Sequence, residues 1–486
     1  SKQIMTRRIL HVGLGLLLIY VLLFVQLELT QVVRADSLRD HPQNTREIGM
    51  VFDAPRGAIK TTDGETVAQT VSVSGTRPRL RQYPYGSLYS HLVGFISAHH
   101  GGDGLERSHN NFLAGRDLAV RVQDKRDFFV DRARTGQIQL SVRHDVQLVA
   151  RAALAGHRGA AVVINPANGA VLAMWSSPHF DPNHLSSHDL AAVTNDVTSL
   201  KSDKESPLLN RADSQLADVG PIFAIVTAAS AIEAGLDDFL APQVDSILVE
   251  TGKEPIGNNK NATCGGGLTE LLVTNCRTGW ATIGSALGMS ELRTRAKAFG
   301  MTESVSNSTG IHLNGVIRFD DETLSAAHIA TGVGVQLSPL HLAHLFATIG
   351  NDGQRIRPRV VDQIQSHDGS VIRDFEPEYL GQVIASETAS KLQTMLAANV
   401  QAGNAQGLAL NEVEVGGILA SASAGHPQVW AIALAPVTQP ELAIAVLLEG
   451  DNLGGPQAAE SVVAAITRSI IEAVLRLPTP NLEGVE

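Results

Sequence analysis

The chain carries few residues whose types and spacing could support catalysis. Ser421 and Ser423 could act as nucleophiles, but no Lys or His is spaced to serve either of them as a base. His341 and His344 stand three residues apart on one predicted helix face, as metal ligands can, but no carboxylate lies near them to complete a site. We therefore expect no metal and no cofactor, local polar roles for the two serines, and exposed or hydrogen-bonded histidines.

Cys264 and Cys276 are the only cysteines in the chain. Two thiols at this spacing make a poor zinc site. In an oxidising compartment they could instead form a disulfide that closes a short loop, which would be worth up to about 3 kcal/mol. Two free, buried cysteines remain the alternative.

A buried helix is predicted over residues 220–235. Gly220 and Pro221 mark its start, because the first helical position does not need the N–H that Pro lacks. Apolar side chains follow on nearly all sides, so solvent should reach little of this helix. Gly235 suits a left-handed cap at its end. The helix itself carries almost no reactive group.

The pattern on either side of this helix predicts an α+β fold. Asn-Gly turn chemistry within residues 160–175 joins two β-branched runs into a hairpin, and two further strands are expected near 430–436 and 442–449. Helical patterns occupy about 269–300, 338–350, 386–400 and 457–475. Helices between an early hairpin and late strands predict an antiparallel sheet with helices on its faces.

The N-terminal part predicts a membrane anchor followed by an extended module. Ile9 to Leu27 is an almost unbroken apolar run that nearly spans a bilayer core, and the basic residues before it indicate a cytoplasmic tail at 1–8. We predict a single transmembrane signal anchor at 9–28, with the rest of the chain outside the cytoplasm; a cleaved signal peptide is the alternative. Residues 29–155 are irregular and Arg-rich with a strand–turn–strand signal, which predicts an extended β-rich domain.

The length of the chain limits the number of its domains, and its charge limits the kinds of partner it can bind. Its 486 residues allow two or three domains. The formal net charge is −11, and no basic run or basic–aromatic patch offsets it. We therefore expect no nucleic-acid partner.

Seven stretches follow one another in a characteristic order. They are Pro55–Ile59, Tyr83–Leu88, His91–Phe95, Gly104–Glu106, Val162–Asn183, Pro207–Ala212 and Gly334–Ala343. Together with the predicted anchor, they resemble class B penicillin-binding proteins, the peptidoglycan D,D-transpeptidases, and most closely the actinobacterial type. The resemblance implies a pedestal (dimerisation-like) domain at 29–155, a transpeptidase domain of the serine β-lactamase type at 156–476, and a polar tail at 477–486.

The resemblance also implies where a catalytic site would lie. The family's reaction uses S-x-x-K for the nucleophile and its Lys, completed by S-x-N and K-T-G. In this chain Pro221 and Ala224 stand in place of the nucleophile and the Lys, and Asn275 and Arg277 in place of the second motif. Ser421–Ala424 occupies the place of the third. Neither S-x-x-K nor K-[ST]-G occurs anywhere else in the chain.

Pro221 removes more than a hydroxyl. In the family the N–H of the nucleophile is one donor to the oxyanion, and Pro has no N–H. Losing one such donor costs roughly 10²–10³ in rate. Together, the three altered motifs predict a pseudoenzyme of the transpeptidase family.

Two features of the expected cleft have alternative interpretations. Arg277 could bind a carboxylate or phosphate ligand there, but a structural ion pair is the favoured role. The family often pairs a Cys at the position of Cys276 with an upstream Cys, so the resemblance implies a disulfide with Cys264.

The predicted function is therefore a membrane-anchored scaffold or regulator of peptidoglycan synthesis or cell division. The family implies a partner, a membrane glycosyltransferase of the SEDS type, which the pedestal and the anchor would contact. One alternative is an active D,D-transpeptidase or carboxypeptidase with an unrecognised nucleophile. Another is a module that binds the muropeptide stem without chemistry.

Overall fold

The computed structural model of the chain describes most of its length. The described residues are 2–30, 55–74, 77–97, 100–121, 134–248, 255–302, 305–306, 311–422, 427–450 and 454–476. Ser423 and the predicted polar tail at 477–486 lie outside the described residues.

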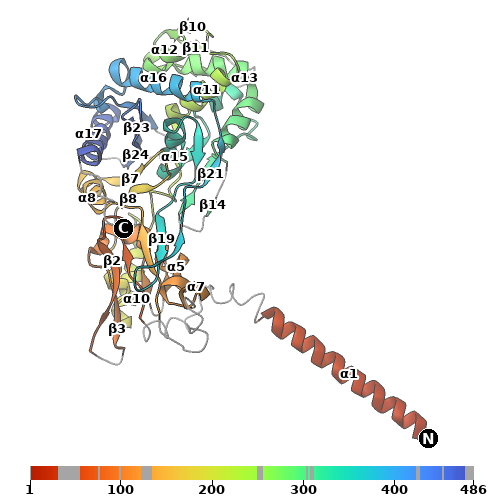
Figure 1. Cartoon of the computed structure of the whole chain (residues 1–486). Coiled ribbons are helices and arrows are strands. Elements are labelled where there is room, and N and C mark those ends of the chain that lie inside the picture. Colours follow the sequence, from red (N-terminus) through yellow and green to blue (C-terminus); the bar gives the residue numbers. More distant parts are fainter. Residues whose placement is uncertain are drawn as a thin grey trace.

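A five-stranded sheet forms the centre of the upper part of the molecule in Figure 1. In spatial order its strands are β22 (Gly416–Ala422), β23 (Gln428–Ala435), β24 (Leu442–Glu449), β7 (Arg158–Ile164) and β8 (Val171–Ser177). Every neighbouring pair is antiparallel. β7 and β8 confirm the predicted hairpin, whose turn is closed by a hydrogen bond from the N–H of Gly169 to the carbonyl oxygen of Asn165.

Helices cover both faces of this sheet, as the sequence predicts. α8 (His144–Ala153) and α17 (Pro456–Arg476) pack together on one face, and α15 (Pro339–Gly350) packs on the other (Figure 1). β24 is buried along its whole length between these helices. The predicted α+β architecture of an antiparallel sheet with helices on its faces is therefore confirmed.

The predicted helix at 220–235 forms in two parts. A 3-10 turn, η4 (Gly220–Phe223), leads into α11 (Ala224–Glu233). The first eight residues of α11 are all buried, so the prediction of an apolar, buried helix is confirmed. Gly235 follows with a φ of 73°, which is the left-handed cap that its position predicts.

The predicted helix at 269–300 is instead divided between α12 (Leu268–Val273) and α13 (Arg277–Ala298). α13 has a further kink at Gly288, whose φ of 75° is not helical. The break between α12 and α13 lies at Asn275, whose φ of 51° is left-handed and cannot continue a right-handed helix. Asn adopts this conformation more readily than most residues, but the apolar periodicity on either side continues and so conceals the break.

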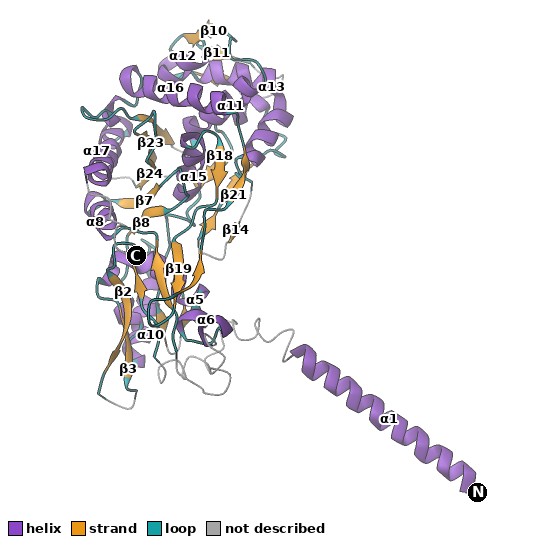
Figure 2. Ribbon diagram, in the orientation of Figure 1, coloured by secondary structure: helices purple, strands orange, loops and turns teal. Residues whose placement is uncertain are grey.

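A second, six-stranded sheet forms the pedestal, drawn in orange in the lower part of Figure 2. Its strands, in order, are β20 (Val371–Asp374), β19 (Val361–Gln365), β6 (Gln137–Leu140), β1 (Ile59–Lys60), β2 (Thr66–Ser72) and β3 (Arg79–Gln82). β1 runs parallel to β6, whereas the other pairs are antiparallel. Because β19 and β20 come from within 156–476, the pedestal sheet crosses the domain boundary predicted at 155.

A buried ion-pair centre holds the pedestal together. The carboxylate of Glu106 accepts from Nε of Arg56 at 2.5 Å and from Nε of Arg81 at 2.6 Å, and all three side chains are at most 3% exposed. Nη1 of Arg81 also donates to the carbonyl oxygen of Gly57 at 2.8 Å. Burial alone would raise the pKa of Glu106, but the charges of the two guanidinium groups outweigh burial and hold that pKa below its usual range.

The N-terminal helix α1 (Lys2–Glu28) stands apart from the rest of the chain in Figure 1. Its large apolar side chains between Leu14 and Leu27 are 48–71% exposed. Among the residues that the structure describes, no helix is both long enough and apolar enough to cross a membrane. The predicted transmembrane anchor at 9–28 is therefore not supported by the structure.

Candidate substrate cleft

η4 lies between the edge of the central sheet and a glycine loop. A Cβ placed on Gly220 would be 3.9 Å from the Cβ of Ala422, the last residue of β22. On another side Gly332 approaches so closely that a Cβ there would lie 1.9 Å from the carbonyl oxygen of Gly220, so only glycine fits. The structure thus brings the start of α11 beside the end of β22.

Pro221 and Ala224 contribute no reactive group to this cleft. Pro221 lies in the first turn of η4, where its missing N–H breaks no helical hydrogen bond. Ala224 begins α11 and is only 2% exposed. Both residues serve the start of the helix and its packing.

Ser421 does not face this helix start. Side chains alternate along a strand, so Ala422 faces η4 while Ser421 points to the opposite face of β22. There its hydroxyl donates to Oε1 of Glu460 on α17 at 2.8 Å. Sequence reasoning missed this partner, because 39 residues separate the two and no local spacing signals the contact.

Asp218 secures the chain that enters η4, and sequence reasoning missed it as well. It lies in β9 (Ala217–Asp218), which pairs with β17 (Val335–Leu337). The indole N–H of Trp430 donates to its carbonyl oxygen at 2.9 Å, and its own N–H donates to Oε1 of Gln428 at 3.0 Å. Nε2 of Gln336 donates to its carboxylate at 3.1 Å. These bonds join strands from both sides of the cleft at the residue that precedes Val219 and η4.

Asn275 and Arg277 lie where α12 gives way to α13, and α13 packs against α11. Arg277 is half-buried at the first residue of α13. Within the described residues its guanidinium group forms no ion pair and no hydrogen bond, so the structural ion pair favoured from the sequence is not seen there.

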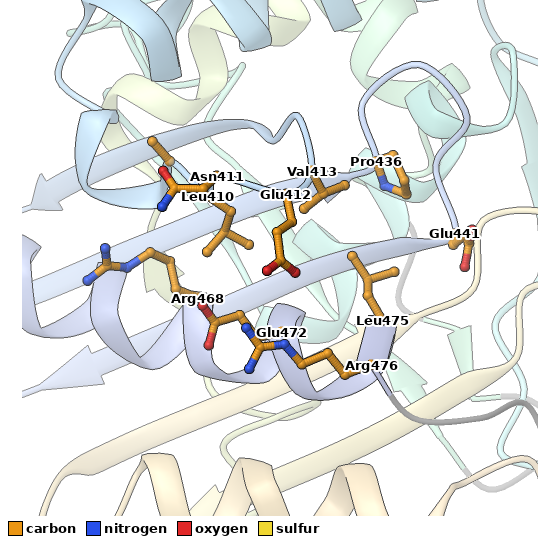
Figure 3. A pocket seen from close by; sticks show the side chains of 11 residues that line it. Leu410, Asn411, Glu412, Val413, Pro436, Glu441, Arg468, Glu472, Leu475 and Arg476 are labelled. Carbon is orange, nitrogen blue, oxygen red and sulfur yellow. The ribbon is translucent and has the colours of Figure 1, made fainter.

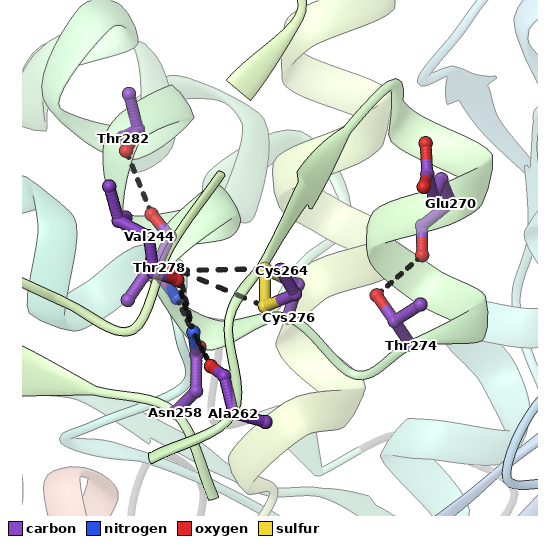
Figure 4. The surroundings of a disulfide bond; sticks show 9 residues. All are labelled: Val244, Asn258, Ala262, Cys264, Glu270, Thr274, Cys276, Thr278 and Thr282. Atoms are coloured by element: carbon purple, nitrogen blue, oxygen red, sulfur yellow. Dashed lines mark hydrogen bonds between the residues drawn. A yellow bond between two sulfur atoms is a disulfide. The ribbon is translucent and has the colours of Figure 1, made fainter. Parts of the chain in front are cut away.

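A disulfide between Cys264 and Cys276 closes the segment around α12 (Figure 4). Its Cα atoms are 5.8 Å apart, and it joins β13 (Cys264–Gly266) to the cap of α13. Asn258 reinforces the same junction: its amide group donates to the hydroxyl of Thr278 and accepts from the N–H of Thr278, each at 3.0 Å. The start of α13, with Arg277, is thus held from two sides.

Two family models match this chain. One, described as the penicillin binding protein transpeptidase domain, matches residues 159–472. The other, described as the penicillin binding protein A dimerisation domain, matches residues 56–138. The chain belongs to the penicillin-binding protein transpeptidase family. The resemblance found in the sequence is confirmed.

Named relatives are similar in sequence to almost the whole chain. "Peptidoglycan D,D-transpeptidase PbpA" of Mycolicibacterium smegmatis is 32% identical over 495 residues, covering 96% of this chain and 98% of the relative. The protein of the same name from Mycobacterium tuberculosis is 30% identical with the same coverage. The crystal structure of PBPA from that organism superposes with a TM-score of 0.80 at 27% identity, covering 87% of this chain and 100% of the other. Its penicillin G acyl-enzyme complex gives the same values.

These relatives contradict the prediction that the chain is a pseudoenzyme. Proteins 30–32% identical to it are named as D,D-transpeptidases, which are enzymes. The prediction depended on three short motifs, whereas the similarity extends over 96% of the chain. Short motifs report the residue types at a few positions and say nothing of other residues that take part in a reaction.

Asp213 lies in the segment that leads into β9 and η4, and it is 3% exposed. Burial raises the pKa of its carboxyl group to about 6, while the hydroxyl of Ser214 and the charge of His312 act in the opposite direction. The unfolded chain would hold this group near its ordinary value of about 3.9. The folded protein therefore binds a proton here that the unfolded chain releases.

We expect this carboxyl group to lower stability as the pH rises from about 4 to about 6, by about 3 kcal/mol. The native pKa is raised, so the penalty is absent below the unfolded pKa and complete above the folded one. Asp213→Asn should remove this fall and be more stable than the unsubstituted chain at about pH 7.5. Urea unfolding at several pH values measures the free energy of unfolding as a function of pH. Asn substitution of the exposed Asp320 (Asp320→Asn) is the matched control. An unchanged pH profile in Asp213→Asn would contradict the expectation.

Removing the disulfide is expected to lower the free energy of unfolding by about 3 kcal/mol, because the open loop gains chain entropy in the unfolded state. The double variant Cys264→Ser and Cys276→Ser should therefore unfold at a lower urea concentration than the oxidised chain. The reduced chain should match the variant, and reductant should not shift the variant further. Equal midpoints for the oxidised and reduced chains would show that the bond does not support the fold.

His341 and His344 lie inside the molecule rather than on its surface. They are 0% and 1% exposed on α15, so the first of the two expected roles, exposure, applies to neither histidine. The second role, hydrogen bonding, is confirmed for His344, whose Nε2 donates to the carbonyl oxygen of Ile356 at 2.9 Å. Burial and the nearby charge of Arg355 hold the pKa of His344 well below its usual range. Across the described part of the chain, no group of three or more potential ligands could hold a metal ion.

Proposed function

We propose that this chain acts in peptidoglycan synthesis at the cell membrane, as a scaffold that also presents a cleft for the peptide stem. The observation that carries the proposal is the edge position of β22, which ends beside η4. An edge strand offers unpaired N–H and C=O groups, to which an extended peptide can add as a further strand. In β22 the carbonyl oxygens of Gly417 and Leu419 already accept from the side-chain amides of Asn399 and Asn404, so we place the peptide at the end of the strand beside η4. The relatives named as peptidoglycan D,D-transpeptidases favour a stem ending in D-Ala–D-Ala as that peptide.

The test of the cleft is a titration of the whole chain with an N-acetylated stem peptide that ends in D-Ala–D-Ala. We expect saturable binding, and we expect Ala422→Leu to weaken it, because the larger side chain fills space beside η4. A peptide that ends in two L-alanines is the matched control ligand. Equal binding of the two peptides, or binding that Ala422→Leu leaves unchanged, would reject the proposed cleft.

The scaffold role concerns a membrane partner. We propose that residues 9–28 anchor the chain in the membrane, and that this anchor and the pedestal contact a glycosyltransferase of the SEDS type. The apolar side chains that α1 exposes support an apolar surrounding for that helix. Replacing 9–28 with an unrelated anchor should reduce co-purification with the glycosyltransferase; undiminished co-purification would argue against the anchor contact.

The relatives favour acyl transfer as a second activity of the same cleft. Position 221 is Pro, so a nucleophile for this reaction has to come from another residue. Incubation with a fluorescent penicillin, followed by intact mass and peptide mapping, would identify such a residue by its adduct. The absence of any adduct would leave stem binding as the activity of the cleft.

A further inference from the structure

A pocket of about 510 Å³ opens at the other end of the central sheet from η4 (Figure 3). Its three walls are the loop Ala409–Val413, the β23–β24 turn with Pro436 and Glu441, and the last turns of α17. β22 begins just after that loop and ends beside η4. Seven extended residues span roughly 20 Å, so the pocket is separate from the candidate cleft.

Charged side chains of both signs converge on this pocket. Arg468, Glu472 and Arg476 follow at intervals of four along α17, which places them on one helix face. Glu412 points at them from the opposite wall, and Glu441 lies at the turn (Figure 3). In the described part of the structure none of these five groups forms an ion pair or a side-chain hydrogen bond. Their charges therefore remain available to a ligand.

The mixture of guanidinium and carboxylate groups in the pocket indicates which class of ligand it can bind. A simple anion would gain two guanidinium groups but meet three carboxylates, and a simple cation would have the reverse problem. A molecule with a carboxylate at one end and an ammonium group at the other can satisfy both sets. Leu410, Val413, Pro436 and Leu475 add an apolar part to the lining, which suits a short alkyl side chain.

We propose that this pocket binds a short zwitterionic peptide, with its ammonium group between Glu412 and Glu472 and its carboxylate at one of the two flanking guanidinium groups, Arg468 or Arg476. Guanidinium groups bind carboxylates through paired, charge-assisted hydrogen bonds, which gives the peptide a defined direction. The volume lies within the usual range for small-ligand sites. The choice of alanine peptides as probes rests on the proposed function, whereas the pocket chemistry does not.

The test is equilibrium dialysis of the whole chain, in detergent, against radiolabelled D-alanyl-D-alanine. We expect one saturable site per chain, weakened at least about tenfold by Arg468→Gln or by Arg476→Gln, whichever removes the guanidinium group that holds the carboxylate, because hydrogen bonds to charged groups are the stronger kind. Glu472→Gln should also weaken it. N-acetylation or C-terminal amidation of the dipeptide should each reduce binding, since each removes one charge, and added salt should weaken it.

Two controls separate this pocket from the cleft. Arg277→Gln and Ala422→Leu should leave binding of the free dipeptide unchanged, and melting temperatures should show that every variant is folded. Binding that Ala422→Leu abolishes and that neither Arg468→Gln nor Arg476→Gln weakens would assign the dipeptide to the cleft, which overturns this inference and supports the proposed function. No saturable binding of D-alanyl-D-alanine or L-alanyl-L-alanine would overturn the inference and leave the proposed function untouched.

Discussion

Glu106→Gln is expected to lower the free energy of unfolding by about 3–5 kcal/mol, because it leaves two buried guanidinium groups without a counter-charge. The carboxylate of Glu106 accepts hydrogen bonds from Nε of both Arg56 and Arg81, and none of the three side chains is more than 3% exposed. The neutral amide keeps the size of the side chain but neither its charge nor its two acceptor oxygens. Chemical denaturation of the whole chain, followed by tryptophan fluorescence, measures the change.

The same substitution should also alter the acid sensitivity of the pedestal. The native pKa of Glu106 is held below its usual range, so its stabilisation is complete above the unfolded value of about 4.3 and is lost as the pH falls through the native one. Glu106→Gln has no such group and should lack this part of the acid transition. Glu205→Gln is the matched control, because its ion pair with Arg158 is exposed and should change stability by less than about 1 kcal/mol. An equal loss in both variants would argue against the buried pair as the cause.

The elements that local pattern defines were predictable from the sequence. The hairpin at 160–175 has its turn chemistry within five residues, and α11 has its start and cap signals beside an unbroken apolar core. The pedestal sheet was not predictable in full. β19 pairs with β6 across more than 200 residues, and such a pairing depends on tertiary packing rather than on any local signal.

In the candidate cleft, too, some features were predictable from local sequence and others depend on tertiary packing. The place of Pro221 at a buried helix start followed from residue types alone, whereas the direction of Ser421 did not. A shift of one residue in the pairing of β22 with β23 would exchange the side chains that face η4 and α17. The register of Ser421 and Ala422 is set by that pairing and not by their own residue types. The polar anchoring of Asp218 depends on Trp430, Gln428 and Gln336, which come from three separate parts of the chain.

The combined substitution Pro221→Ser and Ala224→Lys is expected to be acylated by penicillin roughly 10²-fold faster than Pro221→Ser alone, since a positioned general base contributes roughly 10²–10⁴. Ser at 221 supplies a hydroxyl and also a backbone N–H, the donor that Pro lacks. Position 224 lies three residues later, so its side chain lies on the same helix face. Ala224 is only 2% exposed, so a Lys amine there would be desolvated, and desolvation favours the neutral form that acts as a base.

Fluorescent penicillin labelling gives the rate, and peptide mapping places the adduct at position 221. Ala224→Lys alone is the matched control, because it adds the base without a hydroxyl at 221 and should form no adduct there. A double variant no faster than Pro221→Ser would show that residues 221 and 224 do not meet the substrate as a nucleophile–base pair. The cause would then lie in the walls of the cleft, where Arg277 and Ala422 also differ from the family's motifs, and the next substitutions to combine would be at those two positions.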